Sequence, residues 1–284
     1  MKLSKIFALL LALCLISSAA CAATFTDAHG NVIELDDSLE AYAAVTLVGA
    51  DNAARQGETN LGDLWADALR WFAVSGEINA AFDEDDVKAG NDRIAVDADH
   101  VVALWNGGNL RADIAEGAFG AEALAEVLPF PNKVAVVYMT GAQLLETLEA
   151  ASQGLPYTAE TADACASLMQ VSGLAYTVDT TKAYDALEAY GDHWFTAGSV
   201  SRVRIDDVNG QPFDAEATYA VVTSNANFNG MDSSYVLKAA AEANEQSAVT
   251  TAVVRDVVFR FIAAELNHQV GEAYAAPQGR LTIL

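Results

Sequence analysis

Short apolar runs that alternate with segments of helical period constrain the fold of this chain more than any other feature. Runs such as VVALW (101–105), KVAVVYMT (133–140) and TYAVVTSN (218–225) hold few polar side chains, which is typical of strands buried in a sheet. Amphipathic segments and turn signals separate them along the chain. We therefore expect an α+β (mixed α/β) domain in which helices flank a layered mixed sheet.

Helical spacing of apolar residues is strongest in LGDLWADALRWFAV (61–74), where one stripe would face the core. We predict further helices over 141–152 and 250–266, and a short helix within 120–130 that Pro129 ends.

The remaining apolar or alternating runs predict strands over 41–49, 170–179, 199–208 and the C-terminal RLTIL. The dipeptide Asn209-Gly210 is a strong hairpin turn, so we expect 199–208 to pair with the strand at 218–225. A second hairpin is predicted around the Gly-Asn turn of FTDAHGNVIEL (25–35), and FDEDD (82–86) is read as a solvated acidic loop.

The N-terminus has the pattern of a targeting segment. Lys2 and Lys5 precede the apolar run IFALLLALCLI, which is too short to span a bilayer, and small residues follow. We predict a signal peptide over 1–22, an N-terminal extension over 23–44 and the main domain over 45–284. Cys21 after SAA also resembles a lipoprotein box, so the alternative is a signal that ends before Cys21 and a lipid anchor on that residue.

Composition narrows the class of partner. The formal net charge is −24, with 52% hydrophobic and 19% charged residues, so the chain can bury a large core and its surface repels phosphate backbones and anionic lipid. We expect no nucleic-acid partner and no transmembrane span. Beyond Cys21 the one remaining cysteine after the signal is Cys165, so no internal disulfide framework or cysteine metal cluster is expected.

The stretch WNGGNLRAD (105–113) places an arginine directly after a glycine turn and a predicted strand. Gly107 and Gly108 allow a ligand to approach the main chain, Asn106 offers a donor and an acceptor, and the Arg111 fork suits phosphate or carboxylate. A structural turn with a surface arginine is the competing interpretation of this stretch alone.

Three further stretches make the hypothesis more specific. RQGETNLGDLWADALR (55–70), VLPFPNKVAVVYMTGAQLLETLE (127–149) and LMQVSGLAYTVD, together with WNGGNLRADIAEG, resemble the C-terminal domain of the 5'-nucleotidase and UDP-sugar hydrolase family, in the family's order. The resemblance covers roughly residues 45 to 284 and implies a nucleotide-binding domain in which two aromatic rings hold the base.

The resemblance also implies roles for individual residues, by position in the family's motifs. Arg55 and Arg111 match the arginines at the phosphate end, and Asn106 and Gly108 belong to the loop beside them. The remaining matches are Phe130 as a stacking ring, Asn132 as a hydrogen-bonding partner of the base, Gly173 as a lining residue of the base pocket, and Asp232 as the acceptor of the ribose hydroxyls.

Four of these assignments have a structural alternative. Arg55 could pair with Glu58 on the surface, Phe130 could be a core aromatic, Asn132 could cap a turn, and Asp232 could be the N-cap of the helix that follows.

The chain departs from the family at the second stacking ring. Alignment of Asp232 with the family's aspartate puts Ala226 where the phenylalanine is expected, and Met231 replaces a glycine. Either Phe228 supplies the second ring or the stack is one-sided.

The larger departure concerns catalysis. In the family a separate N-terminal domain with two metals performs the hydrolysis, and the 54 residues before Arg55 are too few for it. Asp27 and His29 resemble an opening metal motif, but a hairpin turn explains them equally, and His193 in GDHWF reads as structural. We therefore expect no catalytic residue, no metal site and no cofactor in this chain.

Three functions remain open at this point. The domain could bind a nucleotide, nucleoside or nucleotide sugar outside the cytoplasm without chemistry of its own. It could complete a 5'-nucleotidase together with a separate metallophosphatase chain. It could also be a degenerate surface domain that keeps the fold and has lost the pocket.

Overall fold

The computed structural model describes residues 23–26, 32–35, 40–82, 94, 96–190 and 194–284. The chain forms two units, 1–40 and 41–284. In the first, β1 (Ala23–Thr26) pairs antiparallel with β2 (Val32–Leu35), within the segment where the sequence predicts a hairpin. The predicted signal segment, Asp27, His29, His193 and most of the acidic loop at 82–86 lie outside the described residues.

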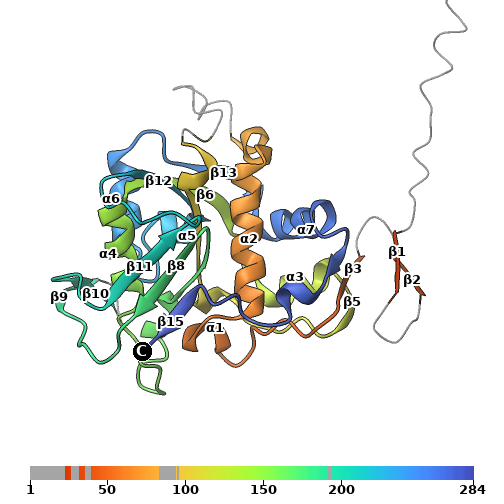
Figure 1. The fold of residues 1–284 in the computed structure, drawn as a ribbon, viewed down its shortest axis with the longest axis horizontal. Coiled ribbons are helices and arrows are strands. Elements are labelled where there is room, and N and C mark those ends of the chain that lie inside the picture. The colour runs from red at the N-terminus through yellow and green to blue at the C-terminus, as the bar shows by residue number, and fades with distance from the viewer. Residues whose placement is uncertain (1–22, 27–31, 36–39, 83–93, 95, 191–193) are drawn as a thin grey trace, which may run out of the picture. The chain divides into compact units, whose positions relative to one another are not determined.

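A five-stranded mixed sheet forms the centre of the second unit (Figure 1). Its strands, in spatial order, are β13 (Ala248–Val253), β6 (Lys133–Thr140), β12 (Thr218–Ser224), β4 (Val101–Asn106) and β7 (Met169–Ser172). β12 runs parallel to β4, and the other neighbours are antiparallel. The predicted mixed α/β class is confirmed.

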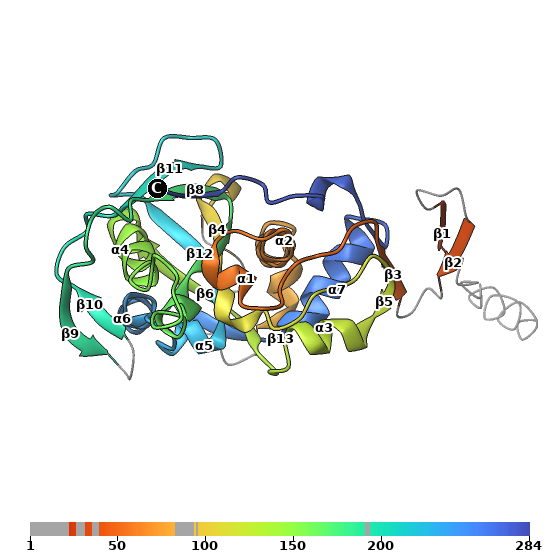
Figure 2. The same ribbon diagram turned by 90° about the horizontal axis from the view of Figure 1, so that it is seen from below.

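The two faces of this sheet are covered by different layers, which explains why its strands are apolar throughout. Val101, Ala103 and Trp105 of β4 face one core, whereas Val102 and Leu104 face the other. Figure 2 shows the helices on either side of the sheet. The first core is covered by α2 (Asn60–Val74), α3 (Ala121–Val127) and α7 (Val254–Ala264), and the second by α4 (Gly141–Ala151) and α6 (Tyr235–Ala243).

The smaller elements complete the layers. One three-stranded sheet has the order β11 (Val203–Val208), β8 (Leu174–Val178), β15 (Leu281–Ile283), and another has the order β14 (Gln269–Val270), β3 (Glu40–Ala43), β5 (Gly117–Gly120). β9 (Ala186–Tyr190) and β10 (Trp194–Ala197) form a hairpin, and α1 (Ala53–Gln56) and α5 (Asn225–Phe228) are single turns. No helix in the described part of the chain has the length and hydropathy of a membrane span.

Caps in the sequence explain where the two best-predicted helices begin. Thr59 accepts a hydrogen bond from the Gly62 N–H at the start of α2. Thr140 and Gln143 form a capping box at the start of α4. The predictions for 61–74 and 141–152 therefore agree with the structure to within one residue at each end.

Three predicted elements differ from the structure. The helix predicted over 250–266 begins only at Val254, because the β-branched run before it pairs with β6 as β13. The strand predicted over 41–49 ends at Ala43, and Leu47 makes only an isolated bridge with Ile114. The strand predicted over 170–179 divides at Gly173, whose φ of +80° turns the chain from β7 into β8.

The turn predicted at Asn209-Gly210 is confirmed, but the predicted pairing of 199–208 with 218–225 is wrong. Both residues have positive φ, and Val208 pairs with Gln211 directly across the turn. Pro212 then removes a backbone donor, so the pairing stops. β11 pairs with β8 instead, while β12 continues into the central sheet.

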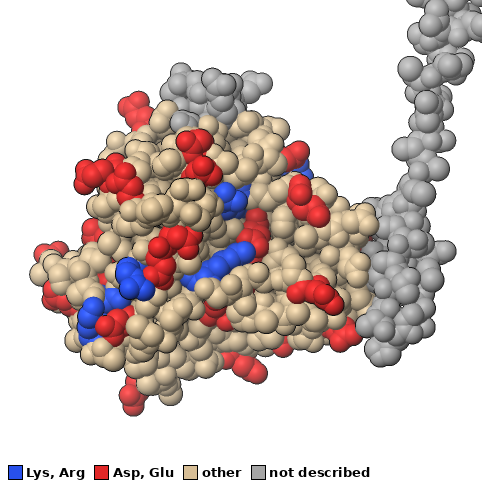
Figure 3. Space-filling model, viewed as in Figure 1, with Lys and Arg blue, Asp and Glu red and all other residues tan. Residues whose placement is uncertain are grey.

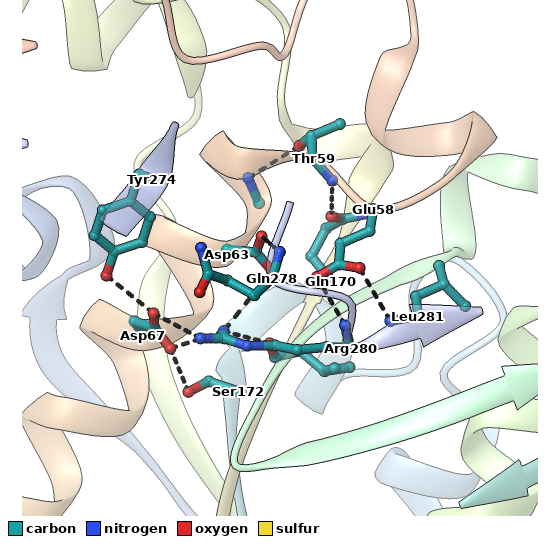
Figure 4. Close-up of polar contacts among 12 residues, drawn as sticks. Glu58, Thr59, Asp63, Asp67, Gln170, Ser172, Tyr274, Gln278, Arg280 and Leu281 are labelled. Atoms are coloured by element: carbon teal, nitrogen blue, oxygen red, sulfur yellow. Dashed lines mark hydrogen bonds and ion pairs between the residues drawn. The ribbon is translucent and has the colours of Figure 1, made fainter. Parts of the chain in front are cut away.

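Hydrogen bonds and ion pairs connect the C-terminal segment to α2 (Figure 4). The Arg280 guanidinium contacts both oxygens of Asp67, at 2.8 and 2.9 Å, and donates to the Val171 carbonyl. Glu58 accepts the N–H groups of Arg280 and Leu281. This network sets the position of the chain directly after α1, which carries a predicted site residue.

Asp63 is the one fully buried carboxylate of this network. Its Oδ2 accepts the Gln278 N–H at 3.0 Å, and the Arg280 guanidinium lies 3.8 Å from its Oδ1. The pKa of Asp63 is raised from 3.8 to about 8, mainly by burial and also by the nearby Glu58 carboxylate, while Arg280 acts in the opposite direction. The folded state therefore holds a proton that the unfolded chain releases at lower pH.

We expect Asp63→Asn to reduce the pH dependence of stability. The raised pKa stabilises the folded state below about pH 4, and this contribution is lost as pH rises toward 8, with a slope of up to about 1.4 kcal/mol per pH unit for one proton. The carboxamide still accepts the Gln278 N–H without titrating. Urea unfolding at several pH values measures the slope, with Glu122→Gln on exposed α3 as the charge-matched control. An unchanged slope in Asp63→Asn would refute this account.

Candidate functional site

The loop that follows β4 is held by close backbone packing. Asn106 ends the strand, and Gly107–Asn109 form a 3-10 turn. A Cβ on Gly107 would lie 1.9 Å from the Ala54 carbonyl oxygen, and one on Gly108 would lie 2.7 Å from the Ala166 Cβ. The glycines therefore permit α1 and the 3-10 turn at 164–167 to approach the loop. Gly108 faces protein in this structure, which differs from its predicted place beside a ligand.

Asn106 links the loop to the predicted acid. Its side-chain N–H donates to Asp232 Oδ2 at 2.7 Å, while its Oδ1 accepts from the Asn109 amide at 2.7 Å. Asn106 is fully buried and its bond with Asn109 is shielded from water, whereas Asp232 is partly exposed. Asp232 lies in a turn with a φ of +50°, and Ser234 rather than Asp232 precedes α6 as its N-cap. The N-cap interpretation of Asp232 is therefore wrong.

Arg55 enters the same region from α1. Only 9% of the residue is exposed, and its Nη1 donates to the Ala162 carbonyl at 2.9 Å, with Asp163 Oδ1 at 3.7 Å. Glu58 is engaged by the backbone of 280–281, so the alternative of an Arg55–Glu58 surface pair is wrong.

Arg111 and Phe130 form the exposed side of the cluster. The guanidinium carbon of Arg111 lies 5.8 Å from the centroid of the Phe130 ring, within range of a cation–π interaction. Phe130 is 43% exposed, so it is not a core aromatic. A ring that is both exposed and oriented by a neighbour offers a flat face to a ligand.

Electrostatic coupling shows that the charged members lie close together. Burial lowers the pKa of Arg111, and the positive charge of Arg55 lowers it further, whereas Asp232 raises it. Burial raises the pKa of Asp232, while Arg55 and Arg111 lower it. Two arginines thus face the partly buried Asp232, and Arg55 also lies 3.7 Å from the exposed Asp163.

The structure therefore brings together five of the nine predicted site residues: Arg55, Asn106, Arg111, Phe130 and Asp232. Gly108 lies in the same loop, and Asn132 is half-buried where its carbonyl accepts the Val254 N–H at the start of α7. Phe228 packs half-buried against the core that α4 and α6 cover.

Gly173 lies at the opposite end of β4. In the β4–β7 register Asn106 pairs with Met169 and Ala103 with Ser172, so Gly173 is about 13 Å further along the strands at roughly 3.3 Å per residue. Its neighbours are Arg70 and Val101. The predicted place of Gly173 beside the other site residues is therefore corrected by strand register, which the motif alone does not reveal.

Sequence reasoning missed residues that support the site without a recognisable signal. Asn109 orients Asn106 but reads as a turn residue, and Ala162 positions Arg55 through its backbone carbonyl, which no side-chain pattern can indicate. Met231, beside Asp232, is 58% exposed. Among the described residues no group of three or more His, Cys, Asp or Glu side chains could hold a metal ion, so they do not fit a two-metal centre.

Comparison with known proteins relates the sequence to one family. The profile of the 5'-nucleotidase C-terminal domain matches residues 40–239, well over half of the chain. The Trifunctional nucleotide phosphoesterase protein YfkN of Bacillus subtilis (strain 168) is 28% identical over 188 residues, which are 65% of this chain and 10% of that protein.

Solved structures give the same relation. A 5'-nucleotidase precursor from Thermus thermophilus is similar with a TM-score of 0.61 and 25% identity, over 92% of this chain and 48% of that one. The Haemophilus influenzae NAD nucleotidase is 14% identical with a TM-score of 0.57 over the same shares, and it supports the fold alone. The chain thus spans less than half the length of these relatives.

A double-mutant cycle should show that Asn106 and Asp232 act as a pair. We expect Asn106→Ala and Asp232→Ala each to lower the unfolding free energy. Either single variant already breaks the shared hydrogen bond, so the double variant should lose about 1–3 kcal/mol less than the sum of the two single effects. Urea unfolding of the four proteins measures it. Additive effects would contradict the geometry, and Arg204→Ala on β11, paired with Asp232→Ala, serves as the control because Arg204 pairs with Asp206 and not with Asp232.

Proposed function

Since the chain belongs to the family of 5'-nucleotidase C-terminal domains, we propose that the cluster at the end of β4 binds a nucleotide, nucleoside or nucleotide sugar. The observation that carries this proposal is the convergence of Arg55, Arg111 and Asp232 beside the exposed ring of Phe130. A site that joins cations, an acceptor and an aromatic face matches the three parts of a nucleotide.

The phosphate end belongs at the arginines. Arg111 is exposed and has no carboxylate partner within salt-bridge distance among the described residues, so its fork is available to phosphate oxygens. Arg55 is oriented by a backbone carbonyl, and its carboxylate neighbour Asp163, at 3.7 Å, is largely exposed, so solvent weakens that pairing. A charge-assisted hydrogen bond of this kind contributes about 1.5–3 kcal/mol.

The sugar and the base belong at the other two groups. Asp232 accepts from Asn106 through Oδ2, which leaves Oδ1 to accept from ribose hydroxyls. The Phe130 ring offers a stacking surface worth about 1–3 kcal/mol per base in single-strand binders. With Ala226 in place of a second ring, and Phe228 packed against the core, the stack is one-sided and base preference is weak.

In this proposal the segment 1–22 directs export of the protein, and the alternative is that a lipid on Cys21 anchors it to a membrane. The protein would then take part in nucleotide catabolism. The two-metal chemistry would belong to a separate metallophosphatase chain, because the described residues present no suitable ligand set. No hydrolytic step is assigned to residues of this chain.

Calorimetry with AMP, adenosine and UDP-glucose tests the binding site. We expect Arg111→Ala to weaken AMP by about tenfold or more, near 1.4 kcal/mol, and adenosine far less, because only AMP carries a phosphate. Phe130→Leu should weaken both ligands similarly.

Arg204→Ala is the control, because it removes the same charge from an exposed arginine on β11. AMP affinity that is equal in wild type and Arg111→Ala, or no heat with any ligand, would favour a degenerate domain that keeps only the fold.

The two-chain hypothesis predicts a strict requirement for both components. Phosphate release from AMP should appear when this protein, a metallophosphatase chain without its own C-terminal domain, and a divalent metal are combined, and Arg111→Ala should lower the rate at subsaturating AMP. A malachite-green assay measures it. Equal rates with and without this protein would remove the hypothesis.

A further inference from the structure

A second groove lies between α2 and α7, away from the proposed nucleotide cluster of Arg55, Asn106, Arg111, Phe130 and Asp232. It has a volume of about 410 Å³, within the range of small-molecule sites, and its apolar wall is formed by Trp71, Val74 and Phe261. Figure 3 shows the face over α2, where the few basic side chains lie near the middle and left, among acidic ones. The groove is closed at the sheet by Ser172, the residue before Gly173.

Arg70 supplies a cation at this sheet end. Its Nε donates to the Val101 carbonyl at 2.9 Å and one terminal nitrogen donates to the Ala98 carbonyl at 3.0 Å. Gly173 is required for this placement, because a Cβ there would lie 2.6 Å from Arg70 Nε. The other terminal nitrogen, Nη1, has no partner among the described residues, and burial lowers the pKa of Arg70. A desolvated cation with an unused donor favours an anionic ligand.

Glu265 supplies an anion on the α7 side. Its Oε1 accepts the Trp71 indole N–H at 2.7 Å, and the Trp71 ring packs on Phe261 at 5.7 Å between centroids. The second carboxylate oxygen has no partner in the part of the chain that the structure describes. The carboxylate is therefore oriented by the aromatic wall and keeps acceptor capacity.

The third charged group of the groove is already satisfied. Asp67 accepts from Ser172, Tyr274 and Arg280, so it is not available to a ligand. The groups left for a ligand are thus the free terminal nitrogen of Arg70, one carboxylate oxygen of Glu265 and the apolar wall. A nucleotide is a poor fit to this groove, because its phosphate would be repelled by the carboxylates of Glu265 and Asp67. A ligand with one positive and one negative charge would match Glu265 and Arg70.

We propose that this groove binds a small zwitterion with an apolar body, namely a free α-amino acid or short peptide with an apolar side chain. Its carboxylate pairs with Arg70, its ammonium group pairs with Glu265, and its side chain packs on Trp71, Val74 and Phe261. The site is separate from the nucleotide cluster, since Gly173 and Asn106 lie at opposite ends of β4.

Calorimetry with L-phenylalanine, the dipeptide Phe-Leu, 3-phenylpropionate and phenethylamine tests the proposal, because the last two each lack one charge. We expect at least one zwitterion to bind at least about fivefold tighter than both single-charge analogues. Glu265→Gln should abolish that preference over 3-phenylpropionate, and its amide oxygen still accepts the Trp71 N–H.

Arg70→Gln should abolish the preference over phenethylamine, because it removes the cation that pairs with the ligand carboxylate. Glu122→Gln is the charge-matched control and should leave all four affinities unchanged. No binding of either zwitterion up to about 10 mM, or equal affinities in wild type and Glu265→Gln, would overturn the proposal. AMP affinity, measured on the same variants, should not change.

Discussion

Burial of the central sheet on both faces is the constraint on which the rest of the structure depends. β4 lies between β12 and β7 and has no exposed residue along its length. Polar side chains that bind a ligand must therefore lie at its ends. Asn106 continues into the loop that leads to Arg111, and the region of Val101 at the other end meets Arg70 and Gly173.

The arginines illustrate how a protein with a net charge of −24 keeps positively charged sites. An arginine paired with a carboxylate would lose its attraction for anions. Arg280 follows this rule, since it is paired with both oxygens of Asp67. Arg70 is instead oriented by the uncharged backbone carbonyls of Val101 and Ala98, and Arg55 by that of Ala162, with the exposed Asp163 nearby at 3.7 Å.

Much of the fold and part of the site could be predicted from local pattern. The caps at Thr59 and Thr140 and the apolar stripes behind them define α2 and α4, because these signals act within a few residues. Local pattern does not decide between helix and strand for the run at 249–253, since its β-branched residues form a strand only where the edge of β6 is available for pairing. Asn209-Gly210 likewise specifies a turn and not which strand follows it in space.

The sequence by itself determined the family, the mixed α/β class and the residue types of the candidate site, because these depend on motif order and on periodicity along the chain. Tertiary structure alone decided which of those residues meet. Strand register separates Gly173 from Asn106, and chain crossings bring Asp232 to Asn106 across 126 positions. Contacts between distant segments depend on how layers pack, and that packing is set by the whole core rather than by any local stretch.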